Sequence, residues 1–179
     1  TENQLMTLNT DGLTMLHLGL GSFHRAHQAI YLQNLIDSGE THWSLAGGNL
    51  RPDMAETIAA LQQQDGQYTL ETVTPAGERR YQRISSIRRV ISYEPSLAGL
   101  ITLGAAADTR IISFTVTEAG YYLDAKNRLD LNFADLASDV EWARRAEPGQ
   151  TIYGALVAIL RARMAADGSR VACRIISRW

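Results

Sequence analysis

Hydrophobic positions along the first third of the chain alternate between strand-like runs and helical spacing. Residues 13 to 18 are nearly all apolar and lead into Gly19-Leu20-Gly21, a pattern that predicts a buried strand followed by a tight turn. From 24 to 37 the apolar residues recur every three or four positions and Gly39 follows, which predicts a helix with a glycine stop. A second apolar run at 43–46 predicts the next strand.

The middle of the chain changes from helical spacing to strict alternation. Residues 54 to 64 have helical spacing, with Asp53 as a candidate N-cap and Asp65-Gly66 as the end of the helix. Between 67 and 92, apolar and polar residues alternate on both sides of Pro75-Ala76-Gly77, which predicts an antiparallel hairpin. This hairpin interrupts the succession of strands and helices.

The last part of the chain returns to the first pattern. Its most β-like stretch, 110–117, predicts a central strand, and a turn-rich segment begins at Asn127. The other expected elements are a helix at 95–107, a helix at 151–166 with Thr151 as its N-cap and Asp167-Gly168 as its stop, and a strand at 171–176.

This order of elements determines the expected fold class. Strands that alternate with helices are joined by right-handed crossovers and form a parallel sheet. The sequence therefore predicts an α/β protein with a Rossmann-like, mostly parallel sheet flanked by helices and an inserted antiparallel hairpin. We assign residues 1–168 to this domain and 169–179 to an atypical C-terminal end.

Composition narrows the classes of partner. The 179 residues are 45% hydrophobic, enough for one buried core, and 17 basic against 19 acidic residues give a net charge of -2. A field this weak would not hold nucleic acid or an anionic membrane, and no apolar run approaches the ~18 residues of a membrane-spanning helix. Cys173 is the only cysteine, so we expect a protein of the reducing cytoplasm. The arginines at 79, 80, 83, 88 and 89 fit a solvated hairpin face better than a nucleic-acid patch.

The turn after the first strand carries the first chemical signal. A dinucleotide-binding turn needs glycine where the backbone bends and where it approaches the pyrophosphate, and Gly19 and Gly21 occupy these two places. His24 stands where the usual third glycine would be, so a plain tight turn fits equally well. Arg25, in the first helical turn, could pair with a phosphate or lie in solvent.

The second strand should carry the group that binds the adenosine ribose. Its end, Gly47-Gly48-Asn49-Leu50-Arg51, has no carboxylate. Asp53 follows closely and could accept the ribose hydroxyls or cap the next helix, whereas Arg51 would suit the phosphate of NADP. The residues alone leave NAD and NADP open.

Other titratable residues suggest a proton-transfer group more than a metal site. His24 and His27 lie three apart on one helix, but no third ligand lies near them in sequence, so we expect no metal. His17 is expected to be a hydrogen-bonded core histidine. Glu118 follows the most hydrophobic strand, where it could act in acid-base chemistry, cap a turn or pair with an arginine.

Five segments taken in order resemble the mannitol dehydrogenase family, the polyol-specific long-chain dehydrogenases. They are GLGSFHRAHQAIYL at 19–32, GGNLRPD at 47–53, DGQYTLETV at 65–73, FTVTEAGYYLD at 114–124 and TIYGALVAIL at 151–160. Within the family the likeness is greatest to the bacterial group that oxidises D-arabinitol to D-xylulose. The GxGxFxRAH segment is far more specific than two glycines alone.

The resemblance implies a Rossmann-like domain that binds NAD, or NADP, without a metal and acts on a small-molecule polyol. It implies that Asp53 lies near the adenosine ribose and that Glu118 assists a proton path without being the main base. From the turn, the second strand and the resemblance together, we predict cofactor contacts by Gly19, Gly21, Ser22, Phe23, His24, Arg25, Asn49, Arg51 and Asp53.

The end of the chain departs from the family pattern. The family's lysine base, with its asparagine and histidine helpers, belongs to a second, helical domain, and none of the three can be mapped here; the chain instead ends SRVACRIISRW. We therefore expect a cofactor-binding portion that is inactive alone and prone to self-association, because the absent domain would cover apolar surface. A uronate reductase fragment and a non-catalytic nucleotide-binding protein are the alternatives.

Overall fold

The structure, a computed structural model, describes residues 12–145, 147–167 and 174–176. Its elements follow one another as β1 (Leu13–Leu18), α1 (Ser22–Ala26), α2 (Gln28–Asp37), β2 (Trp43–Gly48), α3 (Ala55–Gln63), β3 (Tyr68–Val73), β4 (Arg79–Ile84), β5 (Ile87–Ile91), α4 (Ala98–Ala105), β6 (Thr109–Ser113), the short 3-10 helix η1 (Glu118–Tyr121), α5 (Ala134–Arg144), α6 (Ile152–Asp167) and β7 (Arg174–Ile176).

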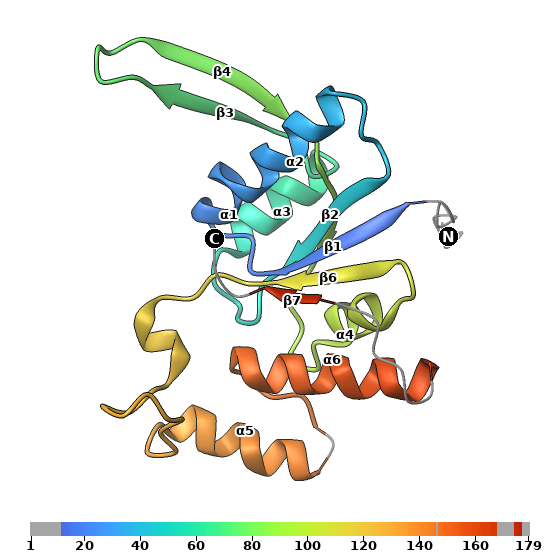
Figure 1. Ribbon diagram of the computed structural model, residues 1–179, viewed down its shortest axis with the longest axis vertical. Coiled ribbons are helices and arrows are strands. Elements are labelled where there is room, and N and C mark those ends of the chain that lie inside the picture. Colours follow the sequence, from blue (N-terminus) through green and yellow to red (C-terminus); the bar gives the residue numbers. More distant parts are fainter. Residues whose placement is uncertain (1–11, 146, 168–173, 177–179) are drawn as a thin grey trace.

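Five strands form one parallel sheet in the order β5-β2-β1-β6-β7, which confirms the expected α/β fold. Helices α1 to α3 lie on one face of the sheet and α4 and α6 on the other, with α5 beyond α6 (Figure 1). Because both faces are covered, most residues of the central strand β1 are buried, its polar residues Thr14 and His17 included. From β1 the chain adds β2 and β5 on one side of the sheet and then β6 and β7 on the other. A crevice is therefore expected between the carboxyl ends of β1 and β6.

Each face of the sheet has its own apolar core. On the α4 and α6 face, Leu16 of β1 and Ile112 of β6 are buried against Leu100 and Ile159. On the other face the fully or nearly fully buried side chains come from α2, α3 and the strands, and include Ala29, Leu32, Leu45, Ile58, Leu61 and Ile87.

The antiparallel hairpin is confirmed for β3 and β4, which pair from Tyr68 opposite Ile84 to Val73 opposite Arg79 and project away from the sheet (Figure 1). The prediction was wrong for residues 87–91, because β5 instead pairs in parallel with β2 at the edge of the main sheet. Between β4 and β5, the Ser86 hydroxyl donates to the Ala29 carbonyl of α2 at 2.7 Å and so holds this connection against α2.

The predicted helix over 24–37 is two helices, α1 and α2. The backbone breaks at His27, whose φ of -130° and ψ of -76° are not helical. The His27 side chain bonds through Nδ1 to the Phe23 carbonyl at 2.9 Å, so it occupies an acceptor of the first helix. Apolar periodicity does not reveal a break of one residue, because the spacing on either side is kept.

Three other differences concern helix ends and the turn-rich segment. Met54, with φ of 58°, is the N-cap of α3, so Asp53 does not cap that helix. Helix α5 lies inside the segment predicted to be turn-rich. The apolar pattern did not predict this helix, because only Leu136 and Asp139 are buried and no clear apolar stripe runs along it. The strand predicted at 110–117 ends at Ser113, and the following residues turn towards the crevice. The last strand is confirmed for 174–176; residues 171–173 lie outside the described residues.

Two buried charges fix α6 against its neighbours. The guanidinium of Arg163, 1% exposed, donates through Nη1 to the carbonyls of Gly104, Ala106 and Thr109 at 2.7 to 3.0 Å. At the other end of α6, Asp139 of α5 accepts the Thr151 N–H at 2.8 Å, and Thr151 caps the helix as predicted, its Oγ1 accepting the Tyr153 N–H at 3.2 Å. Together these bonds hold the N-terminus of α6 at the crevice.

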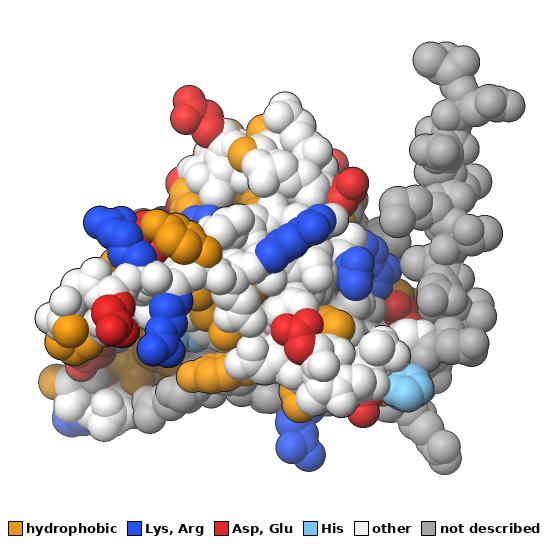
Figure 2. Space-filling view, turned by 90° about the horizontal axis from the view of Figure 1, so that it is seen from above, with side chains coloured by type: hydrophobic (Ala, Val, Ile, Leu, Met, Phe, Trp, Pro, Cys, Tyr) orange, Lys and Arg blue, Asp and Glu red, His pale blue; other side chains and the backbone are white. Residues whose placement is uncertain are grey.

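The surface of the described residues carries charges of both signs and several exposed apolar side chains. On the face in Figure 2, basic and acidic side chains are interspersed rather than gathered by sign. The connection from η1 to α5 exposes between 42% and 57% of each of Leu123, Leu129, Leu131 and Phe133. Self-association through such a surface stays a prediction. In the parts of the chain that the structure describes, no helix is long and apolar enough to cross a membrane.

Candidate cofactor site

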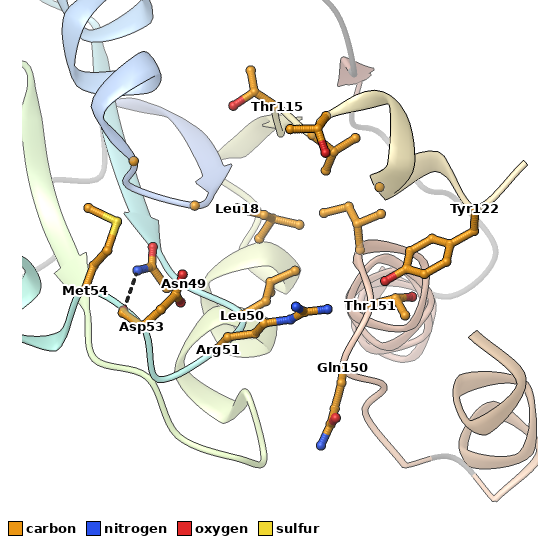
Figure 3. A pocket seen from close by; sticks show the side chains of 16 residues that line it. Leu18, Asn49, Leu50, Arg51, Asp53, Met54, Thr115, Tyr122, Gln150 and Thr151 are labelled. Carbon is orange, nitrogen blue, oxygen red and sulfur yellow. Dashed lines mark hydrogen bonds between the residues drawn. The ribbon is translucent and has the colours of Figure 1, made fainter. Parts of the chain in front are cut away.

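A pocket of about 440 Å3 opens at the carboxyl ends of β1, β2 and β6 and at the N-terminus of α6 (Figure 3). Ligands of open parallel sheets bind at this edge, so the pocket lies where the fold predicts a cofactor. The residues that line it are Leu18, Gly19, Gly21, Asn49, Leu50, Arg51, Asp53, Met54, Thr115, Val116, Thr117, Gly120, Tyr122, Gln150, Thr151 and Ile152.

The two glycines of the first turn border this pocket without packing against the protein. Gly19 has φ of +122°, a conformation that favours glycine, whereas Gly21 has an ordinary φ of -66°. A Cβ atom built on either residue would meet no heavy atom within 4 Å. By contrast, a Cβ on Gly48 would lie 2.6 Å from the Ile91 carbonyl oxygen. Neither conformation nor packing requires a glycine at position 21, so a small residue there leaves space for something outside the chain.

Asn49 holds the glycine turn against the end of β2. Its Oδ1 accepts the Leu20 N–H at 2.8 Å, and its Nδ2 donates to the Asp53 carbonyl at 3.1 Å, the bond drawn in Figure 3. The side chain is 6% exposed and makes both bonds to backbone. Its amide therefore fixes the pocket wall, while no hydrogen bond from the described residues reaches the Asp53 carboxylate, which is exposed.

The other residues predicted to contact the cofactor lie in α1, next to the pocket but not on its wall. Arg25 donates through Nε to the Leu20 carbonyl at 3.1 Å, and its Nη2 lies 3.5 Å from Ser22 Oγ. Phe23 is 53% exposed and its ring stacks on His27, with centroids 4.2 Å apart. His24 points inward and is 1% exposed. Contact of these four residues with a cofactor stays a prediction.

The inward-facing His24 belongs to a buried polar cluster beneath the turn. Its ring stacks on that of His17, with centroids 3.9 Å apart and planes 14° from parallel. His17 Nδ1 bonds to Ser113 Oγ at 2.8 Å, and His24 Nδ1 bonds to Gln28 Oε1 at 2.8 Å. Gln28 in turn donates to Ser113 Oγ at 3.2 Å. The cluster ties α1 and α2 to the carboxyl ends of β1 and β6.

Both histidines are neutral in this cluster. Burial lowers the pKa of His17 to about 2, with His24 as a second cause, and burial lowers the pKa of His24 to about 4. Within the described residues neither Nε2 has a hydrogen-bond partner, so the prediction of a satisfied core histidine holds for only one nitrogen of His17. A second proton on either ring would place a charge in a buried site, on a nitrogen without a hydrogen-bond partner among the described residues.

The opposite wall of the pocket contains a polar group that the sequence did not single out. The Tyr122 hydroxyl donates to Asp135 Oδ2 at 2.7 Å, and Arg51 Nη2 lies 3.6 Å from the same oxygen. The hydrogen bond from Tyr122 holds the pKa of Asp135 below its usual range, with backbone N–H groups and, last, the Arg51 charge as weaker causes. Burial first, and then the bond to Asp135, raises the pKa of Tyr122. Sequence gave no signal for Asp135 because α5 was not predicted.

Glu118 is exposed at the start of η1 and does not line the pocket, although Thr117 and Gly120 on either side of it do. Its assignment to a proton path stays a prediction. In the described part of the chain, no three His, Cys, Asp or Glu side chains are grouped to hold a metal ion.

The matches to known proteins extend over the whole α/β domain. The family model of the mannitol dehydrogenase Rossmann domain matches residues 13–177. D-arabinitol 4-dehydrogenase of Ralstonia nicotianae is 54% identical over 152 residues, which cover 83% of this chain and 31% of that protein. The enzyme of the same name from Klebsiella pneumoniae is 49% identical and is covered to 32% of its length.

Solved structures agree with the sequence comparison. A ternary complex of Pseudomonas fluorescens mannitol 2-dehydrogenase with NAD and D-mannitol superposes with a TM-score of 0.82 at 30% identity, over 96% of this chain and 34% of that one. The chain therefore spans about a third of the length of the relatives it matches. Their shared part is the α/β domain that carries the pocket.

Proposed function

The chain belongs to the mannitol dehydrogenase family, whose Rossmann domain it contains, and from this premise we propose that it binds NAD in the pocket between β1, β2 and β6. We propose further that it is the cofactor-binding portion of an enzyme that oxidises D-arabinitol to D-xylulose. The observation that carries the first proposal is the open space at Gly21, on the wall of that pocket. The polyol is proposed from the two D-arabinitol 4-dehydrogenases at 54% and 49% identity.

The chain's own residues fit a dinucleotide along the pocket. The Gly19–Gly21 backbone allows a pyrophosphate to approach closely, and the first N–H groups of α1 lie at the same place. The Asp53 carboxylate, in the loop after β2, is available to accept hydrogen bonds from the adenosine ribose. NAD, when bound, supplies the hydride acceptor, and the residues after β6 then border the remaining part of the crevice.

Turnover needs more than a bound cofactor. The substrate hydroxyl must be held against the reacting carbon while a base removes its proton, and losing both the positioning and the base costs several orders of magnitude in rate. Among the described pocket residues, Tyr122 has a raised pKa and is hydrogen-bonded to Asp135, so it is a poor base at neutral pH. We therefore propose that this chain alone binds cofactor without oxidising a polyol.

Titration of the purified chain with NADH, followed by the fluorescence of the reduced nicotinamide, tests binding. We expect a saturable change that excess NAD reverses, and no NADH formation from D-arabinitol and NAD. The lack of any saturable change would contradict the proposed site. NADH formation that persists in protein free of host dehydrogenases would instead contradict the absence of a base, and leave the cofactor site intact.

For Glu118 we propose an auxiliary role in proton release, which matters only when a substrate domain is present. Its exposure beside two residues that line the pocket suits a relay between crevice and solvent. A Glu118→Gln substitution in a chain carrying that domain should change the pH dependence of kcat and leave the Kd for NADH within about twofold. A pH profile that matches the parent enzyme would exclude the relay.

A further inference from the structure

Among the described residues that line the pocket, Arg51 is the one whose charge would favour a second phosphate. It follows the end of β2, the strand that faces the adenosine ribose in this fold, and its side chain is 62% exposed. A guanidinium free to turn towards the ribose would form charge-assisted hydrogen bonds with a 2′-phosphate. The direction in which Arg51 is held therefore affects the choice between NAD and NADP.

In the structure Arg51 points across the pocket, away from the ribose side. Its guanidinium extends towards Tyr122 and Thr151, whereas Asp53 and Met54 lie on the other side of the β2 loop (Figure 3). Its Nη2 lies 3.6 Å from Asp135 Oδ2. Part of its charge is therefore already compensated by a carboxylate from α5.

Asp135 is well placed to hold that direction. Its carboxylate accepts the Tyr122 hydroxyl at 2.7 Å, and its Oδ1 accepts the Leu136 N–H at 3.2 Å, so the side chain is fixed from two sides. Tyr122 itself packs edge-on against Phe133, with ring centroids 5.3 Å apart. Asp135 is thus the anchored partner, and Arg51 is the longer and more exposed one.

We propose that Asp135 is a positioning residue that favours NAD over NADP by holding Arg51 on the α5 side of the pocket. The inference rests on the proposed function, because it requires the cofactor to bind in this pocket. It adds a determinant of specificity from α5, outside the glycine turn and the end of β2. Removing the carboxylate charge at 135 frees Arg51 for a 2′-phosphate.

The expected effect is modest because the pair is exposed. Ion pairs with this accessibility contribute little, and a gain of about fivefold in NADPH affinity is the size that such a pair can account for. Asp135→Asn keeps an oxygen that can accept the Tyr122 hydroxyl and removes only the charge. Affinity for NADH should stay within about twofold of the parent value.

The test compares Kd values for NADH and NADPH, each by fluorescence titration, in four proteins: the parent chain, Asp135→Asn, Glu141→Gln, and Arg51→Gln with Asp135→Asn. Glu141 is the matched control, because it lies on the same helix, loses the same charge and pairs with Arg144 rather than Arg51. We expect the ratio of the two Kd values to shift towards NADPH in Asp135→Asn, and not in Glu141→Gln.

Two results would overturn this inference alone while leaving the NAD site standing. One is an unchanged ratio in Asp135→Asn, and the other is a shift of equal size when Arg51 is also replaced, since the carboxylate would then act without Arg51. A parent chain that binds neither dinucleotide would overturn the proposed function and this inference together. The double variant thus separates the positioning of Arg51 from simple repulsion by Asp135.

Discussion

A Gly21→Val chain will fold like the parent and bind NADH at least about a hundredfold more weakly, or not measurably. The backbone at Gly21, φ -66° and ψ 172°, is an extended conformation that valine adopts readily. A Cβ there meets no protein atom within 4 Å, so the added side chain projects into the pocket instead of into the core. The substitution therefore removes ligand space, and its cost to folding should be about 1 kcal/mol or less, from the weaker N-cap.

Two further variants make the result specific to this position. Gly21→Ala adds a single methyl group at the same point and should weaken NADH binding by an intermediate factor. Ala76→Val, at the exposed hairpin turn, adds a larger side chain far from the pocket and should leave the Kd unchanged. Titration calorimetry gives all three values, and thermal unfolding shows whether each variant is folded. Parent-like binding by Gly21→Val would place the pyrophosphate elsewhere.

Acidification from pH 7.5 to pH 5 should lower the free energy of unfolding by roughly 3 to 4 kcal/mol, mainly through His17 and His24. Burial lowers their pKa from 6.5 to about 2 and about 4, so both stay neutral in the folded protein down to acid pH. The unfolded chain takes up these protons once the pH falls below 6.5. Stability is therefore fully present above pH 6.5 and falls by about 1.4 kcal/mol per pH unit for each histidine below it.

Urea unfolding at several pH values between 5 and 7.5 measures this slope, and single variants assign it. His24→Gln should be less stable than the parent at pH 7.5 but lose only about half as much on acidification, because one titrating group remains. His42→Gln, at an exposed histidine outside the buried pair, is the matched control. If His24→Gln and the parent lost equal stability down to pH 5, the buried pair would not be the cause.

The sequence predicted the layered α/β fold because its signal is repeated along the chain. Apolar runs at 13–18 and 43–46, with helical spacing between them, specify a parallel unit even when single boundaries are displaced. The errors fall where tertiary contacts decide. Ile87–Ile91 follows the hairpin directly in sequence, yet it pairs with β2 in the main sheet, and Ile87 is buried in the core.

The sequence predicted the pocket residues that follow β1 and β2 better than those on the opposite wall. Gly19, Gly21, Asn49, Arg51 and Asp53 all line it, because short loops after adjacent parallel strands must meet at one edge of the sheet. Tyr122 and Thr151 line it too, but their meeting depends on how α5 and α6 pack, which no local pattern encodes. The sequence also did not show that His24 points inward. Its neighbour in α1, Arg25, is partly exposed, so the position in the helix alone does not tell which of the two is buried.

The central place of β1 also affects how the chain acquires its fold during synthesis. β1 is translated before both of its partners, β2 and β6, yet it needs both as neighbours, and the contact between His17 and Ser113 joins residues 96 apart in sequence. Contacts at such separation form slowly because a long loop must close first. Until β6 emerges, one edge of β1, four of whose six residues are apolar, stays unpaired. The nascent chain is thus most open to misassociation in the interval between the emergence of β1 and that of β6.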